Sequence, residues 1–183
     1  MTHLNVVSDI GINLRRERKS KKLSIEELSK KSGVSGITIS NIENKKSNPT
    51  VSVLWKLSEA LGVPLTKLFG KLSDSPVKVS KLNQSPYMTD YKGNWIVEPI
   101  FYQDNLEVYR VIMMPNSRYS IEKQHENSLE ILTVMSGKIN VLIDDSKYSL
   151  QDFETISFSA SKKHTYINEG TSKIYLNVIV KYQ

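Results

Sequence analysis

The chain contains 183 residues, and its charge is unevenly distributed along them. Lys and Arg number 25 against 19 Asp and Glu, which gives a formal net charge of +6 at pH 7. Residues 1–70 contain 12 basic and 6 acidic side chains, whereas residues 71–183 contain 13 of each. The excess of positive charge lies in the first part of the chain, where it indicates a surface for a polyanion.

The composition excludes several classes of protein. No apolar run approaches the ~20 residues that a membrane-spanning helix needs, and the first residues lack the basic and apolar regions of a secretory signal. The chain has no Cys, which excludes disulfides, thiol catalysis and Cys-ligated zinc. We therefore expect a folded, cytoplasmic protein that has no membrane partner.

Apolar residues recur at helical spacing between residues 8 and 70, as Ile10 and Leu14 do. Ser24 and Glu27 have the spacing of a capping box, which marks a helix start. The other start and stop signals are two N-cap candidates, two glycines and a proline: Ser35, Thr50, Gly33, Gly62 and Pro64. The pattern predicts five short helices, at about residues 8–20, 24–31, 35–43, 50–61 and 64–69.

The periodicity changes after a polar stretch. Residues 71–85 show no sustained periodicity and are predicted to be a linker between a helical domain over 1–70 and a β-rich domain over 86–183. Short β-prone runs at roughly even spacing are typical of an antiparallel sandwich or barrel. The predicted strands are Leu106–Met113, Glu130–Met135, Lys138–Ile143, Thr155–Phe158 and Ile174–Lys181.

Residues 25–44 meet the requirements of a helix-turn-helix motif. Ser29 is a small residue where two steeply crossing helices approach each other, and Gly33 tolerates the left-handed conformation of the turn. The buried face would consist of Leu28, Val34, Ile39 and Ile42. A small helical bundle that does not bind DNA is the alternative interpretation.

The segment from Ile12 to Phe69 resembles the lambda-repressor-like domain of the XRE family. The resemblance rests on Leu-Ser-Ile-Glu-Glu-Leu-Ser-Lys-Lys-Ser-Gly-Val-Ser, on Thr-Ile-Ser-Asn-Ile-Glu-Asn, on Pro49 and on Leu-Gly-Val-Pro-Leu-Thr-Lys-Leu-Phe. It implies an all-α, five-helix domain whose helix 35–43 enters the major groove of DNA. The residues that it places against DNA are Ser35, Gly36, Ile37, Thr38 and Asn41, with Asn44, Lys45, Lys46 and Arg15 or Arg16 at phosphates. It also implies a structural ion pair between Arg18 and Glu43.

Two departures from the family pattern reduce direct base recognition. Ile25 stands where the family usually has a Gln that contacts the DNA backbone, and Gly36 and Ile37 occupy positions that are often polar. Ile37 can contact a thymine methyl, and Thr38 and Asn41 remain as polar readers, with Asn suited to adenine. We therefore expect DNA shape and phosphate contacts to carry much of the specificity. Lys45 and Lys46 can also be a solvated face without a DNA role.

Three residues of the second half have side chains that bind metals. His125, Glu130 and His164 lie on different predicted segments and could converge inside a barrel on Zn²⁺, Mn²⁺ or Fe²⁺. Each histidine can also be an ordinary surface or hydrogen-bonded residue. If Glu130 points inward, Leu132 points inward with it at period two, and an apolar cavity with a polar cluster is typical of a small-ligand site.

Glu130–Gly137 and His164–Asn168 resemble the two motifs of the cupin family, over about residues 105–181. The resemblance implies an all-β cupin barrel, or double-stranded β-helix, with metal-ligand positions at Lys123, His125, Glu130 and His164. A lysine at the first position weakens the site, because an ammonium repels a dication. Lys123 could instead pair with a carboxylate of an effector. In the second motif, Phe153, Ser159 and Ser161 stand where Gly, Pro and Gly are usual.

The two resemblances together imply a DNA-binding transcriptional regulator, expected to be a repressor. We expect it to bind a pseudo-palindromic operator as a homodimer and to bind a small-molecule effector in its cupin domain, through Lys123, His125, Glu130, Leu132 and His164. The alternatives are a metal-dependent cupin enzyme tethered to DNA and a regulator whose barrel only dimerises. We expect no enzyme, because Lys123 interrupts the four-ligand set.

Overall fold

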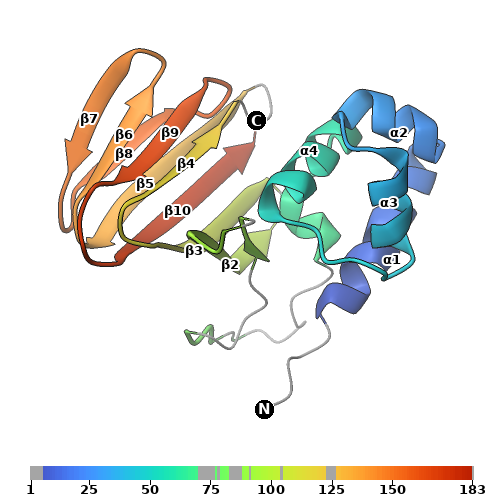
Figure 1. The fold of residues 1–183 in the computed structure, drawn as a ribbon, viewed down its shortest axis with the longest axis horizontal. Helices are drawn as coiled ribbons and strands as arrows, with labels where there is room; N and C mark the ends of the chain where they lie inside the picture. Colours follow the sequence, from blue (N-terminus) through green and yellow to red (C-terminus); the bar gives the residue numbers. More distant parts are fainter. Residues whose placement is uncertain are drawn as a thin grey trace. The chain divides into compact units, whose positions relative to one another are not determined.

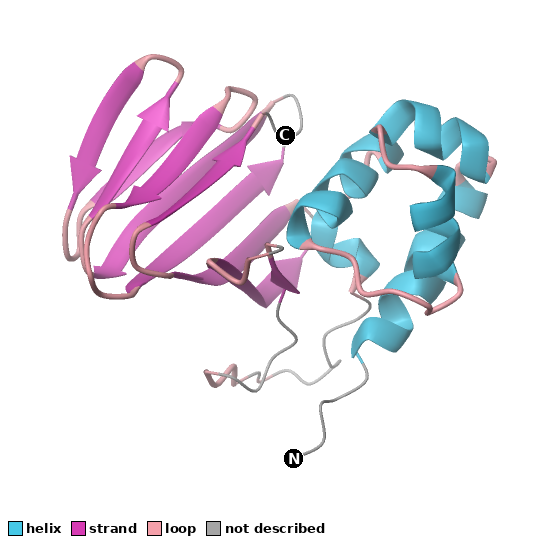
Figure 2. Ribbon diagram, viewed as in Figure 1, coloured by secondary structure: helices cyan, strands magenta, loops and turns pink. Residues whose placement is uncertain are grey.

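The computed structural model describes residues 6–69, 77, 79–82, 88–90, 92–103, 105–122 and 127–182. Its contacts divide the chain into two compact units, and the division falls between Val79 and Ser80. The first unit contains the helices and the second contains the strands (Figure 2). None of the described helices is long and apolar enough to cross a membrane.

The helical unit contains all five helices that the sequence predicts (Figure 1). They are α1 (Val6–Ser20), α2 (Ile25–Ser32), α3 (Gly36–Glu43), α4 (Val51–Leu61) and η1 (Leu65–Leu68). The last is a 3₁₀ helix and not an α-helix, since its short segment after Pro64 closes with bonds such as Phe69 N to the carbonyl of Thr66.

Local capping interactions set the ends of these helices where the sequence predicts them. Ser24 and Glu27 form the capping box: the Glu27 amide donates to Ser24 Oγ at 3.1 Å, and the Ser24 amide donates to Glu27 Oε2 at 2.7 Å. Hydrogen bonds from the Ser24 amide, and secondarily from its hydroxyl, to the carboxylate lower the pKa of Glu27. Gly33 and Gly62 end α2 and α4 in the left-handed conformation, with φ of 68° and 63°.

Helix α1 fixes α3 by two contacts at the C-terminal end of α3. Gly11 lies so close to α3 that a Cβ atom there would stand 2.2 Å from the carbonyl oxygen of Ile42. Arg18 donates from Nε and Nη2 to the two carboxylate oxygens of Glu43, each at 2.7 Å, and donates from Nη1 to the Leu23 carbonyl. The Arg18–Glu43 pair is buried, which confirms its structural role.

The β-rich unit consists of two antiparallel sheets. The six-stranded sheet has the order β1 (Met88–Thr89), β2 (Trp95–Gln103), β3 (Leu106–Met113), β10 (Ile174–Tyr182), β5 (Ser128–Ser136) and β8 (Thr155–Ser159). The four-stranded sheet has the order β4 (Ser117–Ile121), β9 (His164–Asn168), β6 (Ile139–Ile143) and β7 (Ser146–Leu150). The sheets lie face to face as two layers (Figure 1), and this is the expected all-β cupin architecture.

The sequence prediction omits five strands of the structure, β1, β2, β4, β7 and β9, and two of these omissions have a clear physical reason. β2 contains Pro99, which cannot donate to a ladder, and the register with β3 shifts between Pro99 and Phe101. β7 is an exposed strand at the edge of its sheet and lacks a buried apolar alternation until Leu150. Neither strand therefore shows the pattern by which strands are recognised in a sequence.

Strand β5 points every second side chain into the barrel. Glu130, Leu132 and Val134 are buried, whereas Met135 is half exposed. This confirms the period-two prediction for Glu130 and Leu132. On the facing layers, Trp95 stacks on Tyr119 and on Tyr166, with ring centroids 4.8 Å apart in both pairs. Aromatic side chains thus join the two sheets across the interior.

Replacing Gly11 tests the contact between α1 and α3. We expect Gly11→Ala to lower the free energy of unfolding of the helical unit by about 2 kcal/mol or more, because the Ile42 backbone would have to move. The measurement is urea denaturation followed by far-ultraviolet circular dichroism.

The matched control is Gly36→Ala in α3. A Cβ atom at Gly36 would meet only Ile25 Cγ2, at the ordinary distance of 3.5 Å. Stability should then stay the same or rise by up to ~1 kcal/mol, because alanine has less backbone freedom in the unfolded chain. An equal loss in both variants would contradict the proposed role of Gly11.

Candidate DNA-binding surface and barrel centre

The first turn of α3 exposes side chains that are not part of the hydrophobic core. Ile39 and Ile42 are buried on one side of the helix, but Ile37 is 76% exposed. Ser35 is the N-cap residue and is exposed, with its hydroxyl accepting from the Thr38 amide at 3.1 Å. An exposed large apolar residue beside the N-terminus of a helix suits contact with a partner surface.

Thr38 and Asn41, the polar residues predicted to contact bases, differ in the hydrogen bonds that their side chains make. The hydroxyls of Ser35 and Thr38 are hydrogen-bonded to each other at 2.8 Å, which orients both at the start of α3. Asn41 is half-buried, and its carboxamide makes no hydrogen bond within the part of the chain that the structure describes. The Asn41 carboxamide is therefore able to form both donor and acceptor contacts with a base.

The basic residues after α3 are exposed. Lys45 lies in the left-handed region with φ of 59°, and the Lys46 amide donates to the Asn41 carbonyl at 2.8 Å. Asn44 is less available than the sequence suggests, because its Nδ2 donates to the Ser40 carbonyl at 2.8 Å. It therefore caps the end of the helix.

The two arginines of α1 are also exposed, but they are not equivalent. Arg16 pairs with Glu17 at 3.2 Å, so part of its charge is compensated inside the unit. Arg15 forms no ion pair with any residue in the described ranges. Of the two, Arg15 is the better placed to meet a phosphate.

A buried polar centre lies inside the barrel, between β5 and β9. His164 Nδ1 donates to the Lys162 carbonyl at 2.8 Å, because a carbonyl can only accept. In the neutral ring, Nε2 then carries a lone pair. It is buried, has no hydrogen-bond partner among the described residues, and lies 3.7 Å from Glu130 Oε2.

Tyr166 holds the second oxygen of Glu130, since its hydroxyl donates to Oε1. Burial, followed by the charge of Glu130, raises the pKa of Tyr166 well above its ordinary value, so the hydroxyl stays protonated and remains a donor. Phe158 and Tyr166 both present edge-to-face contacts to His164, at centroid distances of 5.0 and 5.4 Å. The centre is therefore buried and lies among aromatic rings.

An imidazole nitrogen and a carboxylate oxygen at this separation can share a divalent ion. Two tetrahedral ligands with bonds of ~2.0–2.1 Å stand roughly 3.4 Å apart, close to the 3.7 Å between His164 Nε2 and Glu130 Oε2. The Nδ1–H donated to a backbone carbonyl is the common arrangement behind a metal-binding histidine. Among the described residues, no cluster of three ligating side chains is found.

The structure brings together three of the predicted barrel residues, Glu130, Leu132 and His164, all of them buried. Lys123 and His125 lie outside the described residues. Sequence reasoning missed Tyr166 and Trp95. Tyr166 follows His164 by two positions on a strand, so period two would have placed it on the same face.

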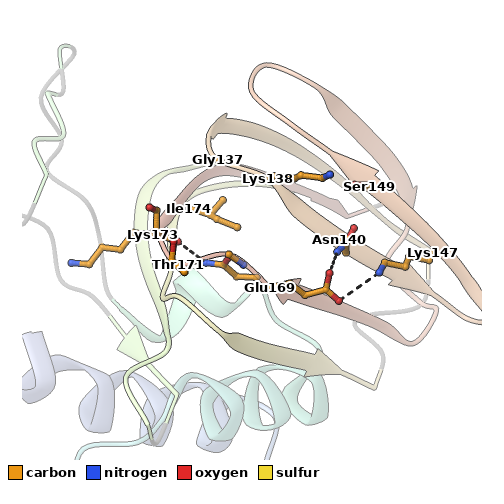
Figure 3. A pocket seen from close by; sticks show the side chains of 12 residues that line it. Gly137, Lys138, Asn140, Lys147, Ser149, Glu169, Thr171, Lys173 and Ile174 are labelled. Carbon is orange, nitrogen blue, oxygen red and sulfur yellow. Dashed lines mark hydrogen bonds and ion pairs between the residues drawn. The ribbon is translucent and has the colours of Figure 1, made fainter.

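A separate depression of about 660 Å³ lies on the β-rich unit, lined by residues of β6, β7 and the 168–174 segment (Figure 3). Asn140 Nδ2 donates to Glu169 Oε2 at 2.8 Å, and Lys147 pairs with Glu169 Oε1 at 3.5 Å. Neither Glu130 nor His164 lines this depression. Gly137 and Asn168, the last residues of the two cupin-like motifs, lie at its wall, but most of the lining residues belong to neither motif, so the depression could not be predicted from the sequence.

Two family models match the chain. The model described as Helix-turn-helix matches residues 14–68, and the model described as Cupin domain matches residues 109–180. The first therefore covers α2 and α3, and the second covers the strands that carry Glu130 and His164.

Curated relatives are similar to the chain over different lengths. The HTH-type transcriptional regulator SutR of Escherichia coli (strain K12) is 23% identical over 181 residues, which cover 97% of both chains. An uncharacterised HTH-type transcriptional regulator, y4dJ of Sinorhizobium fredii, is 37% identical over 67 residues, covering 37% of this chain and 87% of that protein. The HTH-type transcriptional repressor RghR of Bacillus subtilis is 39% identical over 66 residues, covering 36% of this chain and 49% of that protein.

Solved structures agree with both units. The crystal structure of an HTH_3 family transcriptional regulator from Vibrio cholerae covers 100% of this chain and 99% of its own, with a TM-score of 0.81 and 25% identity. A crystal structure of Fe(II) HppE covers 95% of this chain and 98% of its own at a TM-score of 0.50 and 16% identity, which shows a shared fold alone. The chain belongs to the helix-turn-helix transcriptional regulators of the XRE type that carry a C-terminal cupin domain.

Proposed function

We propose that this transcriptional regulator responds to a small molecule bound at the Glu130–His164 centre of its cupin domain. The observation that carries the proposal is His164 Nε2, which is buried, faces Glu130 and has no hydrogen-bond partner among the described residues. Leaving a polar atom buried and unpaired costs about 1–3 kcal/mol. A bound ligand or ion would remove that cost. Trp95 Nε1 is a second such atom in the interior.

For DNA recognition we propose α3 as the reading helix. The exposed Ile37 would contact a thymine methyl, and Asn41 and Thr38 would contact base edges. Ser35 and Gly36 would lie against the groove at the helix start, with phosphates met by Lys45, Lys46, Arg15, Arg16 and Asn44. A protein that binds chromosomal DNA would act in the cytoplasm of a bacterium.

We propose that the regulator acts as a homodimer and as a repressor. One helix of this length reads few base pairs, and two half-sites one DNA turn apart fit a two-fold dimer. The similarity to RghR, named a repressor, supports the direction of regulation. An effector would control DNA binding by having different affinities for the DNA-competent and incompetent states.

A divalent ion, Zn²⁺, Mn²⁺ or Fe²⁺, fits the donors that are present. Glu130 and His164 would hold it, and His125, outside the described residues, would be the third ligand. Bound there, the ion would supply a Lewis-acid site for an anionic effector. Lys123 would add a positive charge for the same anion, and Leu132 would form part of the apolar wall.

A second candidate is a barrel that only supports the fold or the dimer. It is favoured by the aromatic packing, because Trp95 stacks on both Tyr119 and Tyr166 in the interior. A metal-dependent enzyme is less favoured, since the similar curated proteins are named transcriptional regulators.

The DNA-binding register is tested by two alanine variants. Asn41→Ala should weaken binding to the preferred duplex by about 1–3 kcal/mol and relax its sequence preference, because a base contact is lost. Lys46→Ala should weaken binding to all duplexes alike and reduce the salt slope by about 1, because a phosphate contact is lost. The measurement is fluorescence anisotropy on duplexes selected from a random-sequence library. A uniform loss in both variants would show that the register is wrong.

The metal is tested by composition and by thermal shift. Protein purified without chelators should contain about one divalent ion per chain, and His164→Ala and Glu130→Gln should lose it. Tyr166→Phe is the matched control: it removes only the donor to Glu130, so the ion should stay, with affinity lowered about 10–100-fold. If Zn²⁺, Mn²⁺ and Fe²⁺ neither bind to the wild-type chain nor shift its melting temperature, the second candidate is favoured.

A further inference from the structure

Strand β8 leaves one side of the six-stranded sheet open. It lies at the end of the strand order and pairs with β5 on its other side, with Leu129 opposite Ser159 and Thr133 opposite Thr155. No described strand pairs with its outer side. Three of its residues, Thr155, Ser157 and Ser159, are exposed.

The hydrogen bonds to β5 show which backbone groups face outward. The Ala160 amide donates to the Ser128 carbonyl at 2.9 Å, and the Val134 amide donates to the Glu154 carbonyl at 3.0 Å. The amides and carbonyls of the even-numbered residues of β8 are therefore hydrogen-bonded to β5. The odd-numbered residues of Thr155–Ser159 then direct theirs away from the sheet.

The sequence of this edge lacks the charges and prolines that commonly prevent pairing between molecules. Thr-Ile-Ser-Phe-Ser, over 155–159, contains no charge and no proline. Edge strands that stay single usually carry Lys, Pro or an inward charge. By contrast, β7, which is an edge strand of the four-stranded sheet, carries Lys147.

Phe153 occupies a costly conformation at one end of the edge. It has φ of 66° and its side chain is 77% exposed. Its amide donates to the Val134 carbonyl while the Val134 amide donates to Glu154, so two residues oppose Val134 in a bulge. The left-handed residue of such a bulge is normally glycine. Strain at an exposed aromatic residue indicates a contact outside this chain.

We propose that β8 pairs antiparallel with β8 of a second copy, about a two-fold axis through Ser157. Because Ser157 directs its backbone outward, it can pair with itself, and Thr155 of each copy then faces Ser159 of the other. Phe153 of each copy would then lie beside Ser161 of the other, next to the Ser159 and Ser161 hydroxyls, which are 2.8 Å apart.

Charge favours this direction of pairing. Asp152 and Glu154 precede β8, and Lys162 and Lys163 follow it. An antiparallel pair brings the acidic end of each copy to the basic end of the other, whereas a parallel pair brings like charges together. The lysines also pair within their own copy, but those pairs are exposed and therefore weak. A role for this dimer in placing two recognition helices on an operator rests on the function proposed above.

The test is the oligomeric state of the full chain, measured by sedimentation velocity across a concentration series. Ser157→Lys places two ammonium groups opposite each other at the axis, and we expect the dimer dissociation constant to rise at least about tenfold. Ser146→Lys adds the same charge to the exposed edge strand β7 and should leave the dimer unchanged.

Phe153→Gly gives a second, independent arm. Glycine relieves the left-handed strain, so the melting temperature should stay the same or rise by up to about 4 °C, while the dimer should weaken at least about tenfold. If Phe153 only stabilised the fold, Phe153→Gly would lower the melting temperature as well as weaken the dimer. Circular dichroism spectra confirm folding of each variant.

A monomeric wild-type chain, a Ser157→Lys dimer as tight as the wild type, or equal weakening by Ser146→Lys would overturn the interface. The same proteins are tested for binding to a duplex selected from a random-sequence library. If the Ser157→Lys variant still dimerises, this interface is rejected. If the wild-type chain also binds the selected duplex, the proposed function stands. A wild-type dimer that selects no duplex would count against the proposed function instead.

Discussion

The close approach of α1 to the end of α3 is the constraint on which the helical unit depends. Only a residue without Cβ fits at Gly11 against the Ile42 carbonyl, and the buried Arg18–Glu43 pair fixes the same end of α3. With that end fixed, Ile42 faces the core and Ile37 faces outward. A buried charged pair contributes little net stability, but losing one partner costs several kcal/mol. The pair therefore acts mainly to hold α3 in one orientation.

In the barrel, burial gives the Glu130–His164 centre its chemistry. Aromatic rings surround His164, and its Nδ1–H is already committed to the Lys162 carbonyl. The Tyr166 hydroxyl occupies one oxygen of Glu130, so Nε2 and the other oxygen are left facing each other. A buried imidazole nitrogen without a hydrogen-bond partner costs free energy unless something binds it. His164 Nε2 is thus the atom to which the proposed ion or ligand would bind.

Much of the fold was predictable from local patterns. The capping box at Ser24, the left-handed Gly33 and the alternation at Glu130 act over a few residues, so the sequence shows them directly. Pro99 concealed β2, because proline usually excludes a central strand and here lies at a shift in register. The stack on Trp95 could not be predicted once β2 was missed.

The sequence by itself determined the two classes of domain, the helix ends and the residue types available for DNA and metal contacts, because these depend on neighbours along the chain. Tertiary structure decided which of them meet. It placed the Tyr166 hydroxyl on Glu130, stacked Trp95 on Tyr119 and Tyr166, and left β8 open on one side. The reason is that strand order and register join residues distant in sequence, and a local pattern specifies a face of a strand but not its partner.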